Sequence, residues 1–96
     1  MKRHQLRIEA EIDLFEAALW YETEREGLGF DFDTEVHHTL DRIAENRMLF
    51  PVIGRNIRRA IVDRFPYGVF FIEHEEDRIV IGILHLHRAP ETWRAR

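Results

Sequence analysis

The sequence predicts one α+β domain in which a helical hairpin packs on one face of a mostly antiparallel sheet, in the order β-α-α-β-β-β. Two observations predict this fold. Apolar residues recur with the 3.6-residue period of a helix from residue 10 to about residue 45, and after Pro51 they change to the two-residue period of strands. A chain of 96 residues can bury one core but not two, so we assign a single domain to residues 1–96.

The first half of the chain predicts a short strand and two helices. Residues 3–8 alternate between polar and apolar side chains, as in a strand with one face in water. Apolar stripes with helical spacing then cover residues 10–25 and residues 32–44. We expect Gly27 and Gly29 to end the first helix, because a left-handed residue just past the last turn is normally glycine.

The second half predicts three strands that follow an irregular apolar connector, "MLFPVIG". The last strand is apolar on both faces, which predicts a central position in the sheet. The opposite face of the sheet is expected to stay partly open. The predicted strands cover residues 57–62, 67–73 and 78–87, and residues 91–96 form a short helical or frayed tail.

Charges are unevenly distributed along the chain. Residues 1–48 contain six basic and twelve acidic residues, a net charge of −6, whereas residues 49–96 contain eight basic and six acidic residues, a net charge of +2. All eight basic residues of the second half are arginine, which prefers planar, bidentate contacts with carboxylate or phosphate. We therefore expect an anionic partner to bind the second half; the alternative is a solvated surface with scattered charges.

Composition excludes several classes of site. The chain has no cysteine, so it has no disulfide, no thiolate zinc site and no thiol nucleophile. Its apolar runs are too short to span a bilayer, and its first residues lack the apolar core of a signal peptide. We therefore expect a cytoplasmic protein without a membrane partner. A net charge of −4 also argues against a stand-alone nucleic-acid-binding protein.

The segment "GILHLHRAP" carries the candidate polar site. Alternation along a strand places His85 and His87 on one face and Arg88 on the other. Zinc requires three or four ligands, and further donors such as His74 are expected at the far end of the neighbouring strand, whereas Tyr67 lies beside the histidines. We therefore expect no metal site and no cofactor. The histidines are then either general acid–base groups, or polar side chains that lie at the solvent-exposed end of a strand or contact a partner.

Four segments together resemble the RelE/ParE superfamily of toxins from bacterial type II toxin–antitoxin modules. They are "DLFEAALWYETEREGLGFDF", "LDRIAENRMLFPVI", "IRRAIVDRFPYGVFF" and "ILHLHRAPETWR", and the resemblance runs from about residue 8 to residue 94. It implies the fold predicted above and a protein that arrests growth unless a cognate antitoxin binds it. It also implies one of two targets: RelE-like members cut messenger RNA on the ribosome, and ParE-like members poison DNA gyrase.

The motifs favour the ParE-like side. The long helical hairpin and its Gly-Leu-Gly junction resemble ParE-like members. When the hairpins are aligned on Tyr67, Gly68 stands where RelE-like members have a catalytic Arg, and Ile61 stands where they have a Lys. Trp93 stands near the position of a family Tyr, and an indole neither donates nor accepts the proton that RNA cleavage requires. Two further positions do match the family: Arg59 falls on a basic position, and Arg88 matches the C-terminal Arg.

The resemblance and the residues lead to three functional hypotheses. The first is a toxin that binds a protein target such as DNA gyrase, with target or antitoxin contacts at Arg58, Arg64, Tyr67 and Trp93. The second is an endoribonuclease that cleaves mRNA with His85, His87, Arg59 and Arg88. The third is an inactive member that only binds its antitoxin.

Two local questions stay open in the sequence. Arg58 and Arg59 are adjacent in a strand and face opposite ways, so we expect one to pair with acidic residues of the helical hairpin and the other to lie on the open face of the sheet. The indole of Trp93 either folds back over the edge of the sheet or anchors a partner.

Overall fold

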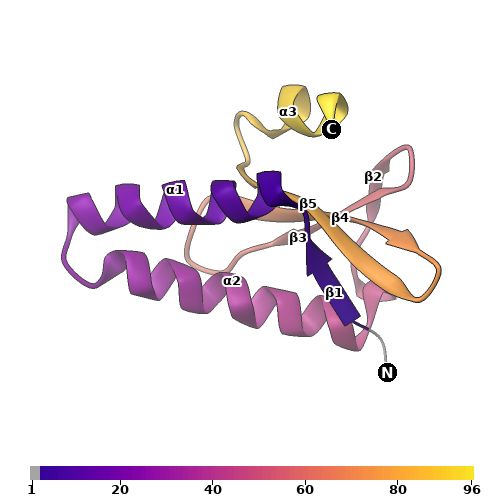
Figure 1. The fold of residues 1–96 in the computed structure, drawn as a ribbon, viewed down its shortest axis with the longest axis horizontal. Coiled ribbons are helices and arrows are strands. Elements are labelled where there is room, and N and C mark those ends of the chain that lie inside the picture. The colour runs from indigo at the N-terminus through magenta and orange to yellow at the C-terminus, as the bar shows by residue number, and fades with distance from the viewer. Residues whose placement is uncertain (1–2) are drawn as a thin grey trace.

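A computed structural model describes residues 3–96 and shows two helices packed on a five-stranded sheet (Figure 1). The predicted α+β fold is confirmed. In chain order the elements are β1 (Arg3–Leu6), α1 (Ile8–Glu24), α2 (Leu28–Glu45), a 3₁₀ turn (Arg47–Leu49), β2 (Val52–Gly54), β3 (Ile57–Ile61), β4 (Tyr67–His74), β5 (Asp77–His85) and α3 (Ala89–Ala95). Among residues 3–96, no helix is both long enough and apolar enough to cross a bilayer.

The sheet has the strand order β1-β5-β4-β3-β2, and β5 is central between β1 and β4 as predicted. Strand β1 runs parallel to β5, and the other neighbours are antiparallel. The expectation of an irregular connector over "MLFPVIG" is wrong in part, because Val52–Gly54 form the edge strand β2. A strand of three residues has too few positions to show alternation, and its antiparallel pairing with β3 across the turn at Arg55 is irregular, with a register shift between Val52 and Gly54.

The junction between the two helices depends on one carboxylate and two glycines. Gly27 has φ of +86° and precedes α2 as predicted for a left-handed residue, whereas Gly29 lies in the first turn of α2 rather than at the end of α1. A Cβ at Gly29 would lie 2.4 Å from the carbonyl oxygen of Ala18, so glycine permits the close approach of the helices. The carboxylate of Glu22 accepts hydrogen bonds from the N–H groups of Gly27 and Gly29 at 2.9 and 3.0 Å.

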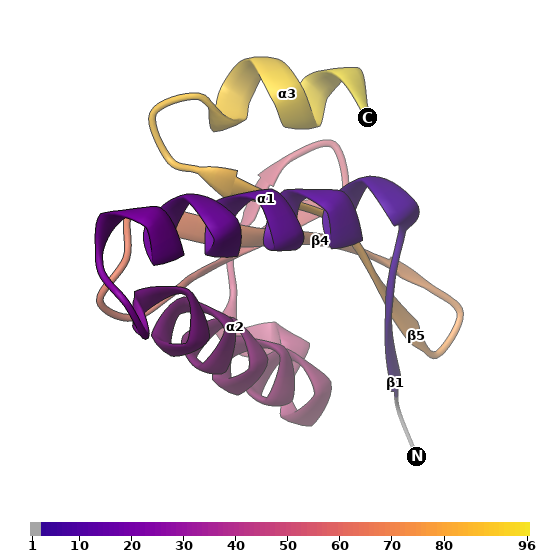
Figure 2. The ribbon, with the colours of Figure 1, turned by 60° about the vertical axis from the view of Figure 1, so that its left-hand side comes forward.

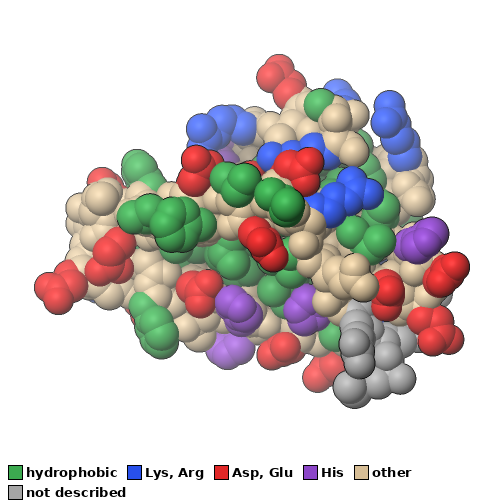
Figure 3. All heavy atoms as spheres, in the orientation of Figure 1, with side chains coloured by type: hydrophobic (Ala, Val, Ile, Leu, Met, Phe, Trp, Pro, Cys, Tyr) green, Lys and Arg blue, Asp and Glu red, His purple; other side chains and the backbone are tan. Residues whose placement is uncertain are grey.

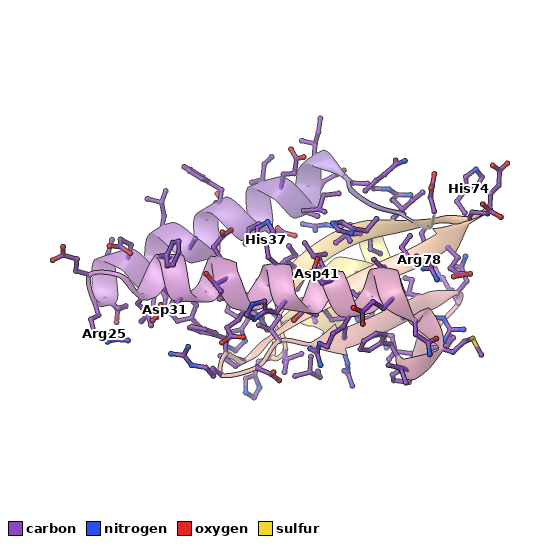
Figure 4. All side chains as sticks on the ribbon, turned by 90° about the horizontal axis from the view of Figure 1, so that it is seen from below. Arg25, Asp31, His37, Asp41, His74 and Arg78 are labelled. Atoms are coloured by element: carbon purple, nitrogen blue, oxygen red, sulfur yellow. The ribbon has the colours of Figure 1, made fainter. Side chains whose placement is uncertain are left out.

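The main core lies between the helical hairpin and the first face of the sheet. An aromatic cluster closes one end of it: Phe32 of α2 contacts Tyr21, Phe65 and Tyr67, with ring centroids 4.9–5.1 Å apart. The solvent-facing side of α2 carries polar residues such as His37 and Asp41, both of which are exposed (Figure 4). The apolar stripe predicted for the second helix is therefore the face that packs on the sheet.

A second, smaller core lies on the opposite face, beneath α3. Trp93 and Ala89 of α3 pack there with Phe70 and Ile81 of the sheet, and Figure 2 shows α3 and α2 on opposite sides of the sheet. The predicted tail is thus an ordered helix that covers part of this face. Ile61, on the same face, stays 44% exposed, so the face is only partly covered.

Candidate functional site

An open groove of about 750 Å³ separates α1 from α3 and reaches the end of β5. Its floor is the paired end of β4 and β5, and its walls are one side of α1 and the segment that leads into α3. The lining residues are Asp13, Glu16, Ala17, Trp20, Tyr21, Pro66, Tyr67, Ile83, Leu84, His85, Arg88, Thr92 and Arg96. Three of the eight residues predicted from the sequence, namely Tyr67, His85 and Arg88, therefore share one concave surface.

His85 is the last residue of β5, where Tyr67 of β4 is its cross-strand partner. The two rings meet edge to face at 5.3 Å, and the ring of His87 stacks on His85 at 5.4 Å. The backbone N–H of His87 donates to Nδ1 of His85 at 3.2 Å, so the proton of a neutral His85 is carried by Nε2. His87 itself lies in the turn after β5, and its ring does not line the groove.

The electrostatics of the groove keep His85 neutral. Its partial burial, and secondarily the charges of Arg88 and His87, lower the pKa of His85 below the ordinary value of 6.5. Burial also raises the pKa of the Tyr67 hydroxyl, so this phenol stays protonated. At neutral pH the groove therefore presents a neutral imidazole, a phenol and the guanidinium of Arg88.

An ion pair between Asp13 and Arg96 forms the opposite wall. Both guanidinium NH₂ groups of Arg96 donate to Asp13, at 2.5 and 3.2 Å. Strand β1 ends opposite Val80, and beyond that point the pair replaces it: Asp13 accepts from the N–H of Ile83 at 3.1 Å, and Arg96 donates to the carbonyl of Ile81 at 3.0 Å. The pair thus ties α1, β5 and the C-terminus together.

Arg58 and Arg59 lie on opposite faces of β3, as predicted. Arg58 is paired with Phe71 and faces the helical hairpin, where it donates to the carbonyl of Phe50 at 2.6 Å instead of the acidic partner that we expected. Arg59 is paired with Phe70 and faces the side of α3. Its Nε is buried without a hydrogen-bond partner among residues 3–96. Neither arginine lines the groove.

Arg64 and Trp93 also lie away from the groove. The guanidinium of Arg64 is within 3.8 Å of Asp31 and 3.4 Å of Glu35, so it is attached to the first turns of α2. Trp93 is only 7% exposed and packs over Gly54, where a Cβ would lie 2.8 Å from the indole. Of the two alternatives for this indole, the structure shows the one in which it folds back over the sheet.

No three His, Asp or Glu side chains within residues 3–96 are placed to share a metal ion. His74 lies at the tip of the β4–β5 hairpin, at the opposite end of the molecule from the interhelical turn that holds Arg25 (Figure 4). His85 lies at the other end of β4, where it is paired with Tyr67, so His74 and His85 are far apart.

Sequence reasoning missed the α1 side of the groove. Asp13 adjoins the buried stripe of α1, one helical turn from the buried Ala10 and Ala17. A carboxylate at that position predicts a buried cation, but its partner, Arg96, is 83 residues away in the sequence. Trp20 lies at the rim of the groove, where it is 56% exposed.

Comparison with known proteins identifies the fold. No protein-family model and no curated protein matches the sequence. A chain in the solved structure described as "Chromosomal ParDE TA system from P. aeruginosa" matches 90% of this chain and 96% of its own length, with a TM-score of 0.78 and 12% sequence identity. The two chains share one fold. The resemblance seen in the sequence segments is thereby confirmed at the level of the fold.

Proposed function

We propose that this chain is the toxin of a type II toxin–antitoxin module, held inactive by a cognate antitoxin, and that it acts by binding a protein target such as DNA gyrase. The observation that carries the proposal is the agreement with a ParDE chain over nearly the whole of both chains. The four sequence segments that resemble RelE/ParE toxins lie within the same part of the chain, between α1 and α3. Fold and motifs thus support the same family of activities.

The groove favours a protein partner over an RNA strand. Trp20 and Arg88 are exposed along its lining, and Trp and Arg are among the residues that dominate protein–protein binding energies. The second arginine of the groove, Arg96, is already neutralised by Asp13. Glu16 adds an unfavourable charge for a phosphate backbone on the α1 wall.

Induction of the chain in a bacterial host without its antitoxin tests the proposal. Growth should stop, and Trp20→Ala should relieve the arrest because it removes exposed surface from the groove at little cost in stability. Phe30→Ala, which truncates a residue 73% exposed on α2, is the matched control and should arrest growth like the unmodified chain. Normal growth at equal soluble expression would instead indicate that the chain is an inactive member of the superfamily that only binds its antitoxin.

The endoribonuclease alternative is supported by the cluster of His85, Tyr67 and Arg88. Arg88 can offset charge on a phosphate, and the neutral His85 can donate a hydrogen bond or proton from Nε2. Two residues argue against this alternative. Arg59 does not line the groove that holds the cluster, and Gly68 supplies no charge. A translating extract decides between the two: mRNA cleavage at the ribosome that disappears in a His85→Ala, His87→Ala variant would establish this alternative.

A further inference from the structure

Helix α1 is apolar on two opposite sides, and only one of them is used by the fold. Ala10 and Ala17 face the sheet and are buried. On the far side, four large apolar residues face solvent: Ile8 is 71% exposed, Ile12 49%, Phe15 66% and Leu19 49%. We call these four residues the outer face of α1. Figure 3 shows hydrophobic and acidic side chains gathered along this helix.

The spacing of the outer face is that of a helix–helix seam. Its members follow one another at intervals of four, three and four residues, the a/d pattern of a coiled coil. The seam spans about 17 Å of helix, because each residue rises 1.5 Å. The next position of the pattern is Glu22, whose carboxylate is engaged by the N–H groups of Gly27 and Gly29, so the seam ends there.

Most of the positions that flank the seam are acidic. In the same pattern, three of the four e and g positions beside the apolar residues are glutamate, namely Glu9, Glu11 and Glu16, and the fourth is Ala18; the whole of α1 contains six acidic residues and no basic one. Residues at e and g set the choice of partner, since like charges repel across the seam and opposite charges attract. A second copy of α1 would oppose glutamate to glutamate, and an anionic lipid surface would meet the same repulsion.

We propose that the outer face of α1 binds an amphipathic helix of another protein, with an apolar stripe of three turns flanked by lysine or arginine. Apolar side chains of such a helix cover Ile12 and Phe15, and its basic residues pair with Glu9, Glu11 and Glu16. This surface is distinct from the floor of the groove, although Glu16 borders both. It does not require that the chain be a toxin, so its test is a binding measurement on the purified protein.

Isothermal titration with two synthetic helical peptides of about 18 residues tests the proposal. Both carry leucine at a and d; one has lysine and the other glutamate at e and g. The lysine peptide should bind at least about tenfold more tightly than the glutamate peptide, and more weakly at high salt. A Phe15→Ser, Leu19→Ser variant should lose this binding, whereas Phe30→Ser, at a residue of α2 that is 73% exposed, should retain it.

Three results would overturn the proposal. The first is equal binding, or no binding, of the two peptides. The second is lysine-peptide binding that persists in the Phe15→Ser, Leu19→Ser variant while circular dichroism shows a folded protein. The third is occupation of the outer face by another ligand: a dimer in sedimentation equilibrium, or adsorption to phosphatidylglycerol vesicles, either of which is abolished by the same two substitutions.

Discussion

Asp13 and Arg96 meet at the edge of β5 although they lie 83 residues apart in the sequence. The side chains are 14% and 21% exposed, and each also bonds to the backbone of β5. Buried backbone groups must be paired, and β1 is too short to pair them here. The Asp13–Arg96 ion pair therefore makes the hydrogen bonds to the backbone of β5 that a longer β1 would make, and it forms a wall of the groove.

Substitution Asp13→Ala measures this role. The variant leaves Arg96 without its carboxylate and the N–H of Ile83 without its acceptor, which we expect to cost about 2–3 kcal/mol in the free energy of unfolding. Asp13→Asn keeps an acceptor oxygen and should lose less, and Glu11→Gln, on the exposed side of α1, should change little. Urea unfolding of the four proteins provides the comparison. An Asp13→Ala midpoint equal to that of the unmodified chain would contradict this role.

His85 predicts a pH dependence with a definite sign. Its folded-state pKa lies below the ordinary 6.5, so between the two values the unfolded chain binds more protons than the folded one. The contribution of His85 to stability is therefore complete above about pH 6.5 and declines as the pH falls toward the folded-state pKa. An NMR titration of the imidazole should show a midpoint below 6.5 that rises in Arg88→Ala. A midpoint at or above 6.5 would contradict the lowered pKa of His85.

At the scale of elements, periodicity predicted the long helices and the strands from β3 onward because each repeats its pattern several times. It did not predict β2, which is three residues long, or the role of Gly29, which depends on a carbonyl of the other helix. It also left α1 ambiguous. The apolar stripe predicted over residues 10–25 includes Phe15 and Leu19, whereas the structure exposes both on the outer face of α1.

Gly29→Ala tests the helix junction. The new methyl group would overlap the carbonyl of Ala18, which belongs to the backbone and cannot rotate away, so we expect a loss of about 1–3 kcal/mol. Gly27→Ala is the matched control: it has open space around the new Cβ but a left-handed backbone, and it should cost about 1 kcal/mol or less. Thermal unfolding ranks the two variants, and the reverse order would show that backbone conformation rather than helix contact governs this turn.

At the scale of the whole molecule, the sequence predicted that a helical hairpin packs on one face of a sheet, and it resembled a known family. It did not predict how the groove is assembled. Tyr67 beside His85 followed from the hairpin between β4 and β5, since antiparallel register is local. The sequence does not decide which of Arg58 and Arg59 lies on the open face of the sheet, because that depends on which face α3 covers. It predicts only a helical or frayed tail for this segment. The groove depends on the contact between α1 and the C-terminus, which neither periodicity nor spacing encodes.

The central claim is that this fold acts by binding a protein, and supercoiling of relaxed plasmid by purified DNA gyrase tests it most directly. The purified chain should inhibit supercoiling, Trp20→Ala should raise the concentration needed at least about tenfold, and Phe30→Ala should leave it unchanged. Full supercoiling in the presence of the folded chain, together with mRNA cleavage by the same preparation in a translating extract, would contradict the claim.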